Sequence, residues 1–374
     1  MPKTKIFKKI SYIITAVAFM VTAFNFNVIN ALASNVVLTV HAFDKTYKIY
    51  SYETSIYNGK RVLNNAIEKV EEIYYDTLIK YKNAEITFNP NQSEKFKIKK
   101  GRNGKQIDKN ALLVDISNAL NNNLNEVTAK QVIIEREVTE KYLSSLTNLR
   151  ARFTTYYNPV EERAKNIALA SSYLSGATVN ENEEFSFNKA VGERTEERGF
   201  LKAKIILDGE FIEGVGGGVC QVSTTTYNAL LLSGLKITEQ HAHSLPVSYV
   251  EPSFDAMVSF GFSDLKFYND TGGKIFIGVS TSENSVTVSI YGKKMDRYYE
   301  RVSKTIEETP PLEREVIYSS DLKPNETKVL QYAKNGVKSE GYLIEYSLNG
   351  ERLKTKLIRK DSYKSVREKV LVGK

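Results

Sequence analysis

A chain of 374 residues is too long for one hydrophobic core, and its length indicates two or three domains. Hydrophobic residues make up 41% and charged residues 26%, an ordinary globular composition that excludes wholesale disorder. The formal net charge of +8 suits a surface that faces anionic polymers or lipid headgroups, but charge alone identifies no partner.

The first 33 residues have the pattern of an export signal. Lysines at positions 3, 5, 8 and 9 precede an apolar run over residues 10–24. This run is shorter than the roughly 20 residues that span a membrane, and Ala31-Leu32-Ala33 has the small-residue pattern of a cleavage site. We predict cleavage after Ala33, with retention as an N-terminal membrane anchor as the alternative. Both place the rest of the chain in the extracellular cell envelope.

Residues 35–148 are predicted to form an α+β domain. An alternating strand pattern over residues 35–52 precedes an amphipathic helix over 62–81, and further short strands follow at 84–88, 96–98 and 131–138. Asp108 is placed to cap a helix that runs to residue 119.

Residues 150–294 are predicted to form a mixed α/β central domain. Pro159 stands in the first turn of a helix that ends before Gly176. A glycine loop over residues 214–218 leads through Cys220 into an apolar helix over 221–233. Strands are then predicted at residues 257–262, 275–280 and 285–291.

The last part of the chain is predicted to be a small all-β module over residues 312–374, with turns at Asn335-Gly336 and Asn349-Gly350. The charged residues 295–311, which end in Pro310-Pro311, are predicted to be a linker. The predicted fold class is therefore α+β and multidomain.

Cys220 is the only cysteine of the chain, so it cannot form an intramolecular disulfide. A cysteine in the first turn of a helix lies near the positive end of the helix dipole, which favours the thiolate. Preceding glycines let a substrate approach and leave N–H groups free for an oxyanion, as acyl transfer requires. We predict that Cys220 is a nucleophile and that the substrate is bound by Gly216, Gly217, Gly218 and Gln221.

A thiolate nucleophile needs a base, and histidine has a suitable pKa. Of the three histidines, His41 lies in the N-terminal domain, whereas His241 and His243 follow the Cys220 helix closely. Residues two apart in an extended segment share a face, so both rings could face the sulfur. We favour His243 as the base, with Asp255 or Asp264 orienting its ring.

Less specific interpretations compete with each of these roles. A lone cysteine is often a small buried hydrophobe, and a histidine pair is often a surface feature. One cysteine with His-x-His could ligate zinc, but the sequence has no Cys-x-x-Cys pair, and we predict neither metal nor cofactor. The glycine loop lacks the Lys-Ser/Thr ending of a nucleotide-binding P-loop. Arg194 and Arg198 are solvated charges by default and would otherwise hold a substrate carboxylate.

The motif around Cys220 resembles the VanW family. It runs from Gly214 as Gly-Val-Gly-Gly-Gly-Val-Cys-Gln-Val-Ser-Thr-Thr-Thr-Tyr-Asn-Ala and continues at His243 as His-Ser-Leu-Pro-Val-Ser-Tyr-Val, which adds Ser244 to the candidate substrate-binding residues. The resemblance covers roughly residues 154–291. Residues 35–148 resemble the peptidoglycan-binding domain that often precedes it in YoaR-type members, and the C-terminal module resembles the "G-five" domain of wall-binding proteins.

Some VanW-family members are regarded as L,D-transpeptidases, and the resemblance implies that activity here. Cys220 would attack the third residue of a tetrapeptide stem, expel D-Ala and hold a thioester, which an amine of a neighbouring stem converts into a 3-3 peptidoglycan cross-link. The implied partners are peptidoglycan stem peptides, with anionic wall polymers as further candidates, and no nucleic acid. The alternatives are a cysteine amidase or endopeptidase of peptidoglycan, and a non-catalytic wall-binding protein.

Overall fold

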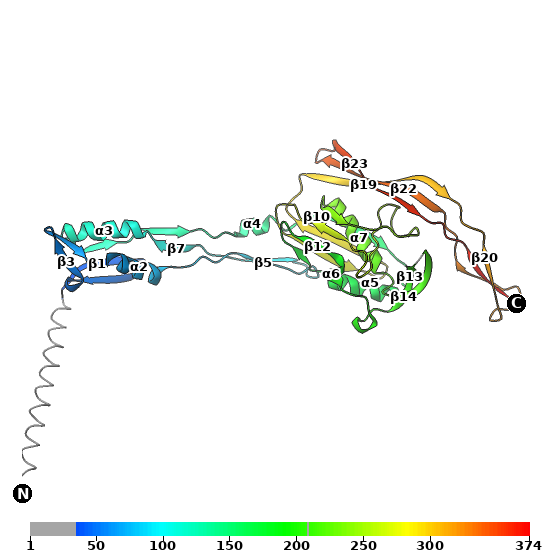
Figure 1. Cartoon of the computed structure of the whole chain (residues 1–374), viewed down its shortest axis with the longest axis horizontal. Coiled ribbons are helices and arrows are strands. Elements are labelled where there is room, and N and C mark those ends of the chain that lie inside the picture. The colour runs from blue at the N-terminus through cyan, green and yellow to red at the C-terminus, as the bar shows by residue number, and fades with distance from the viewer. Residues whose placement is uncertain (1–34, 208) are drawn as a thin grey trace, which may run out of the picture. The chain divides into compact units, whose positions relative to one another are not determined.

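The computed structural model describes residues 35–207 and 209–374, so the predicted export signal lies outside the described residues (Figure 1). The chain divides into two compact units, and the described part of the first comprises residues 35–85 and 100–139. The second comprises residues 86–99 and 140–374. Within the described ranges, no helix is long and apolar enough to cross a membrane.

The first unit is a small α+β domain. Its elements are β1 (Val36–Ala42), β2 (Lys45–Tyr50), a 3-10 turn (Ser51–Glu53), β3 (Thr54–Tyr57), β4 (Lys60–Leu63), α2 (Ala66–Thr77), β7 (Gly104–Ile107), α3 (Lys109–Asn121), β8 (Glu126–Thr128) and β9 (Gln131–Ile134). Strand β1 pairs with β2 antiparallel and with β8 parallel, and β3 pairs with β4 and β7 with β9. Alternate β1 residues Leu38 and Val40 are fully buried and form one core with Ile73 of α2 and Leu112 of α3.

Several local predictions in this unit agree with the structure, and two differ from it. The Asp108 carboxylate accepts a hydrogen bond of 3.1 Å from the backbone N–H of Ala111 and caps α3, as predicted. The predicted strand over residues 35–52 is instead the β1–β2 hairpin, which turns at Phe43 with φ 56°. The first helix begins at Ala66 because residues 60–63 pair with β3.

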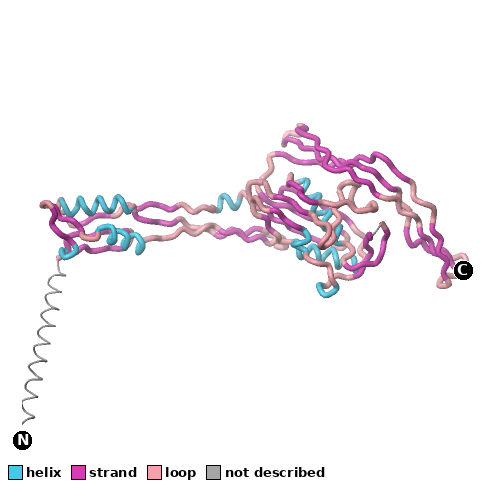
Figure 2. Tube along the Cα trace, viewed as in Figure 1, coloured by secondary structure: helices cyan, strands magenta, loops and turns pink. Residues whose placement is uncertain are grey.

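The second unit contains the central domain. Its elements are β5 (Glu85–Phe88), β6 (Phe96–Lys99), α4 (Glu140–Ser144), β10 (Asn148–Tyr156), α5 (Glu161–Leu174), β11 (Thr178–Val179), β12 (Glu184–Ser186), α6 (Phe187–Val191), a 3-10 turn (Glu196–Arg198), β13 (Lys202–Leu207), β14 (Glu210–Val215), α7 (Val219–Leu232), β15 (Lys236–Glu239), β16 (Lys266–Tyr268), β17 (Ile275–Thr281) and β18 (Ser285–Gly292). Figure 2 shows that strands dominate. The described chain is a mixed, strand-rich multidomain protein, in agreement with the predicted class.

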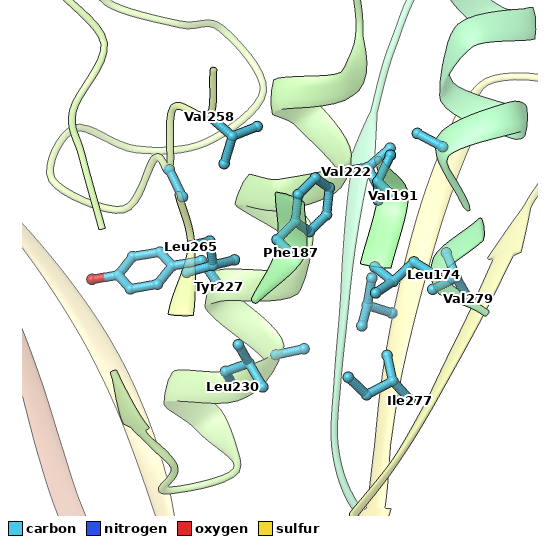
Figure 3. Packing of buried hydrophobic residues seen from close by; sticks show 14 of the residues in the cluster. Leu174, Phe187, Val191, Val222, Tyr227, Leu230, Val258, Leu265, Ile277 and Val279 are labelled. Atoms are coloured by element: carbon cyan, nitrogen blue, oxygen red, sulfur yellow. The ribbon is translucent and has the colours of Figure 1, made fainter. Parts of the chain in front are cut away.

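The core of the central domain lies between helices and a four-stranded sheet in the order β10-β18-β17-β11. Helices α5 and α7 pack against this sheet, as Leu174, Val222 and Ile277 show in Figure 3. Ile277 and Ile290 of the sheet are fully buried. On the opposite face, Phe276 packs against the rings of Phe88 and Phe96. The sheet is therefore covered on both faces, and its long apolar strands follow from that burial.

Helix α7 is buried along nearly its whole length, although it carries three consecutive threonines, residues 224–226. The hydroxyl groups of Thr225 and Thr226 donate to carbonyl groups four residues earlier, at 2.6 and 2.8 Å. The Asn228 amide donates to the Thr224 and Phe254 carbonyl groups. Because these polar groups are hydrogen-bonded, the helix can occupy the core.

The segment that follows β15 differs from its prediction. Residues 257–262, expected as a strand, form only isolated bridges, one between His241 and Met257 and one between Ser259 and Ser263. The neighbouring backbone is held by α7 instead, since the Ser223 hydroxyl donates to the Ala256 carbonyl and the Thr224 hydroxyl accepts from the Ala256 N–H. These side-chain bonds replace the strand pairing that the apolar pattern suggested.

The C-terminal module is all-β. Its strands are β19 (Arg297–Thr309), β20 (Glu315–Ser319), β21 (Thr327–Gln331), β22 (Gly336–Ser347), β23 (Arg352–Tyr363) and β24 (Lys369–Gly373), in sheets of order β19-β22-β23 and β20-β24-β21. Gly350, with φ 86°, lies in the predicted turn between β22 and β23. The expected linker at residues 295–311 is wrong, because residues 297–309 pair with β22 along their whole length. Charged side chains on the exposed face of that strand gave it the composition of a linker.

Candidate active site

Cys220 lies in the first turn of α7, directly after a loop whose glycines are required by close packing. Gly216 and Gly218 have φ angles of +83° and +113°, which disfavour other residues. A Cβ atom on Gly217 would lie 2.7 Å from the Lys204 carbonyl oxygen, and one on Gly216 would lie 2.9 Å from the Arg194 Cβ. The loop therefore packs tightly against β13 and against the backbone that carries Arg194.

Three backbone N–H groups in the glycine loop and the first turn of α7 have no backbone acceptor in the described residues. Among the residues that the structure describes, no backbone hydrogen bond uses the N–H groups of Gly217, Gly218 or Cys220. The first N–H groups of a helix lack intrahelical partners and attract negative charge. These N–H groups are the candidate oxyanion donors.

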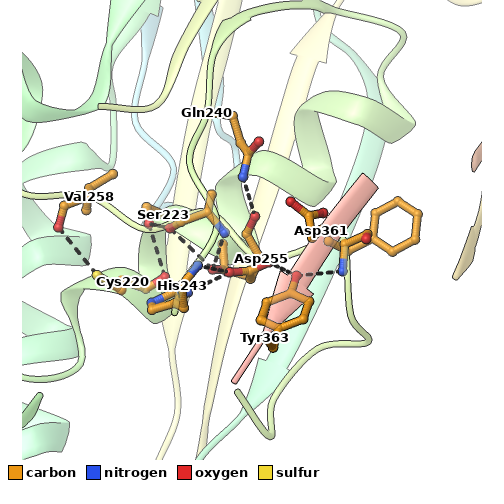
Figure 4. A network of polar contacts seen from close by, with 12 residues as sticks. Cys220, Ser223, Gln240, His243, Asp255, Val258, Asp361 and Tyr363 are labelled. Carbon is orange, nitrogen blue, oxygen red and sulfur yellow. Dashed lines mark hydrogen bonds and ion pairs between the residues drawn. The ribbon is translucent and has the colours of Figure 1, made fainter. Parts of the chain in front are cut away.

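His243 and Asp255 extend a polar line from the sulfur of Cys220 (Figure 4). The charges of the His243 imidazole and the Cys220 side chain interact, and Nδ1 of His243 lies 2.7 Å from Oδ2 of Asp255. The same Oδ2 accepts the backbone N–H of His243 at 2.7 Å. The thiol also contacts the Val258 carbonyl oxygen at 3.5 Å. With Nδ1 held by Asp255, Nε2 is the ring nitrogen available to the sulfur.

The pKa directions in this line favour an ion pair. Burial would raise the pKa of Cys220, but the interaction with His243, together with the Val258 backbone and the charge of Arg194, outweighs burial and lowers that pKa below its ordinary value. Burial would lower the pKa of His243, yet its bonds to Asp255 and Cys220 raise it to about 9. Asp255 has a lowered pKa despite burial, because His243 and Arg359 stabilise its carboxylate. These directions favour the thiolate of Cys220, the imidazolium of His243 and the carboxylate of Asp255.

The pH dependence of thiol alkylation tests this ion pair. Since only the thiolate reacts, we expect the alkylation rate of Cys220 to rise with pH around a midpoint below about 8.5, the ordinary cysteine value. Intact mass follows the reaction without ambiguity, because Cys220 is the only cysteine. The urea-unfolded chain is the control, and a native midpoint at or above the unfolded one would contradict the ion pair.

The two other candidates, His241 and Asp264, have partners outside the line of Cys220, His243 and Asp255. His241 places its Nε2 3.0 Å from Oε1 of Glu239. Asp264 is the alternative third member, but its carboxylate accepts from the Ser186 hydroxyl and from the backbone N–H groups of Asn188 and Leu265. Of the two rings, that of His243 interacts with Cys220, whereas that of His241 pairs with Glu239. Within the described residues no group of His, Cys, Asp and Glu has the arrangement of a metal site.

Gln221 and Arg198 do not have the geometry that their predicted substrate contacts require. Gln221 is 1% exposed, and its side chain accepts from Arg163 and donates to the Thr155 hydroxyl and the Tyr156 carbonyl. Its backbone N–H donates to Gly218. Gln221 thus anchors α7 internally because all its polar groups are used within the fold.

Arg198 likewise holds the chain rather than facing the sulfur. Its guanidinium donates to the carbonyl groups of Val191, at 2.8 Å, and Glu193 and lies over the Tyr173 ring. Both carbonyl groups flank Gly192, where φ is +79°. Arg198 therefore holds the loop that presents Arg194.

Arg194 is the basic residue that the structure brings to Cys220, and the charges of the two side chains interact. Burial lowers the pKa of Arg194. Its Nη1 and Nη2 are buried and have no hydrogen-bond partner among the described residues. Buried donors without partners are rare, which makes this guanidinium a candidate for binding an anionic ligand. The exposed Ser244 follows His243, and its role stays a prediction.

Some neighbours of the site were not found from the sequence. Tyr249 interacts with the Cys220 charge, and burial together with that charge raises the pKa of Tyr249 well above its ordinary range. The sequence could have pointed to Tyr249, because this residue lies within the VanW-like motif that begins at His243. Asp255 also contacts Arg359 and Tyr363 of the C-terminal module. No local pattern marks these two, because they lie 104 and 108 residues away in the chain.

Three family models match successive parts of the chain. Residues 162–291 match the family described as "VanW like protein", and they contain the glycine loop, Cys220, His243 and Asp255. The central domain belongs to the VanW family. Residues 58–129 match the "Putative peptidoglycan binding domain" and residues 301–374 match the "G5 domain". These families associate the chain with peptidoglycan and the cell wall.

Two curated relatives align with about two fifths of the chain. The uncharacterized protein YoaR of Bacillus subtilis is 40% identical over 146 residues, which cover 39% of this chain and 48% of that protein. The Vancomycin B-type resistance protein VanW of Enterococcus faecalis is 26% identical over 156 residues, 40% of this chain and 56% of that protein. The chain thus spans about half the length of the curated relatives it matches. A solved IgA1 protease G5 domain shares 20% identity over 21% of this chain and 94% of its own, at a TM-score of 0.14, too low to compare folds.

Proposed function

We propose that the VanW domain is a cysteine acyltransferase, an L,D-transpeptidase that forms 3-3 cross-links between peptidoglycan stem peptides. The observation that carries the proposal is the line from Cys220 through His243 to Asp255, in which each member has the partner that nucleophilic acyl transfer requires. The peptidoglycan-binding and G5 families that flank this domain support a cell-wall substrate.

In the first half-reaction, the Cys220 thiolate attacks the carbonyl carbon of the third stem residue. The negative charge that develops on the carbonyl oxygen is stabilised by the free N–H groups of Gly218 and Cys220. His243, protonated through its raised pKa of about 9, donates the Nε2 proton to the departing amide nitrogen. The C–N bond breaks, D-Ala leaves, and a thioester remains on Cys220.

In the second half-reaction, an amine of a neighbouring stem attacks the thioester carbonyl. Neutral His243 takes the proton that the amine loses, the C–S bond breaks, and the thiolate–imidazolium pair is restored. One amide bond is exchanged for another, so the reaction needs no external energy source. If water attacks in place of the amine, the same residues make a peptidase, which is the alternative activity.

Arg194 is proposed to bind the carboxylate of the departing D-Ala, since its buried donors lack a partner within the described fold. We expect Arg194→Gln to lower kcat/KM about 10- to 100-fold, because a hydrogen bond to a charged group contributes roughly 1.5–3 kcal/mol. The measurement compares tetrapeptide stems with a free and an amidated terminal carboxylate. Amidation should impair the wild type and leave Arg194→Gln nearly unchanged. Equal sensitivity of both proteins to amidation would contradict this role. The Arg194→Lys variant keeps the positive charge but lacks the planar pair of N–H donors, so it tests whether that pair is needed.

The proposed function is tested by intact mass of the chain incubated with disaccharide-tetrapeptide, together with mass analysis of the products. Wild-type protein should carry a thioester adduct and yield 3-3 dimers with free D-Ala, and Cys220→Ala should give neither. Cleaved peptides without dimers would indicate the hydrolase. Folded protein that forms no adduct and no product would overturn the enzymatic proposal in favour of a wall-binding protein.

A further inference from the structure

The Asp255 carboxylate is held from two different modules. Its Oδ2 accepts from His243, within the VanW domain. Its Oδ1 accepts the Tyr363 hydroxyl at 2.6 Å and lies 3.4 Å from Nη2 of Arg359. Both of these residues belong to β23 of the G5 module, and Figure 4 shows Tyr363 beside Asp255. Every hydrogen bond that the structure gives to Oδ1 therefore comes from the C-terminal module.

Burial makes these contacts consequential. The side chains of Asp255 and Arg359 are 1% and 8% exposed, so water cannot replace a missing partner. A buried carboxylate without compensating donors is costly and tends to become protonated. Arg359 also donates to the backbone carbonyl group of Asp255 and to the Asp361 carboxylate, which fixes the position of its guanidinium.

Further contacts fix the same segment against the module. The backbone N–H of Ser253 donates to the Tyr363 hydroxyl at 2.8 Å, and the Ser253 hydroxyl lies 2.7 Å from that of Ser339. The Ser244 carbonyl accepts the Lys364 N–H at 2.9 Å. The chain that carries His243 and Asp255 is irregular, and it lies between α7 and the module. Packing from the module therefore replaces the strand pairing that this segment lacks.

We propose that the G5 module is a structural part of the catalytic centre, in which Tyr363 and Arg359 are positioning residues that hold the Asp255 carboxylate toward His243. This inference rests on the proposed function and deepens it. The guanidinium of Arg359 also brings positive charge to the buried Asp255 carboxylate, although it shares that charge with Asp361. Removing Arg359 takes one positive charge from this group of buried charges, so the thiolate becomes less favoured.

The experiment measures alkylation of Cys220 by iodoacetamide as a function of pH, with intact mass as the readout and the full chain as the sample. Arg359→Gln is expected to move the midpoint upward by on the order of one pH unit, which slows alkylation about tenfold below the midpoint. Tyr363→Phe removes one oxygen atom and should shift the midpoint in the same direction by a smaller amount. Arg359→Lys should restore most of the wild-type profile, because it restores the charge.

Ser303→Ala is the matched control. The Ser303 hydroxyl donates to the Pro252 carbonyl across the same interface but does not contact Asp255, so its profile should equal that of the wild type. Wild-type profiles in both folded Tyr363→Phe and Arg359→Gln would overturn the proposal, and Tyr363→Phe decides alone if Arg359→Gln does not fold. Alkylation needs no substrate, so a failure to find transpeptidation leaves this test intact.

Discussion

Replacing His243 by glutamine is expected to slow acylation of Cys220 by about 10³-fold, within the range of general acid–base catalysis. Glutamine fills a similar volume but can neither accept the thiol proton nor protonate the leaving amine. Because burial then acts on Cys220 without the imidazolium, its pKa should also rise. The rate of thioester formation on tetrapeptide stems, followed by intact mass, measures the effect.

His241 provides a matched control two residues away. Its ring pairs with Glu239 and is 40% exposed, whereas the side chain of His243 is 6% exposed. His241→Gln should therefore keep the acylation rate within about twofold of the wild type, as expected for a surface substitution away from the chemistry. A comparable loss in both variants, or a loss only in His241→Gln, would refute the assignment of His243 as the base.

The second large effect is expected for Asp255→Asn, which should slow acylation by on the order of 10²- to 10⁴-fold. The asparagine amide keeps the size of the side chain but has no negative charge to stabilise the imidazolium. Its NH₂ group would also point a hydrogen-bond donor at a donor of either His243 or Tyr363. The pKa of His243 should fall from about 9 toward its ordinary value, so the alkaline limit of activity moves to lower pH. The pH profile of kcat measures this shift.

Asp264→Asn separates a catalytic from a structural carboxylate. Asp264 accepts from the Ser186 hydroxyl and two backbone N–H groups, so its replacement should lower the free energy of unfolding by roughly 1–3 kcal/mol. The acylation rate of the folded variant should stay near that of the wild type. Urea unfolding gives the first quantity and intact mass the second. A pH profile altered in Asp264→Asn and unaltered in Asp255→Asn would reverse the assignment.

Features that depend on near neighbours in the chain were readily predicted from the sequence. The Asp108 cap, the turn at Gly350 and the helix that follows the glycine loop agree with the structure, because caps, tight turns and helix starts are decided within a few residues. Residues 297–309 were misjudged because an exposed strand face can be as charged as a linker. Gln221 was predicted to contact substrate because nothing in the sequence around it indicates that its side chain is buried.

The choice between candidates of the same type required the tertiary structure. The chain alone pointed to Cys220, since the lone cysteine and its glycine loop are adjacent and their chemistry is local. The sequence did not decide between His241 and His243 as the base, or between Asp255 and Asp264 as the residue that orients it. Each pair offers the same functional group at a similar distance along the chain. Only packing distinguished them: α7 and the C-terminal module hold the segment around Asp255 without regular pairing, and Tyr363, 108 residues away, reaches its carboxylate. Contacts between segments this far apart depend on how the modules dock, which no local pattern encodes.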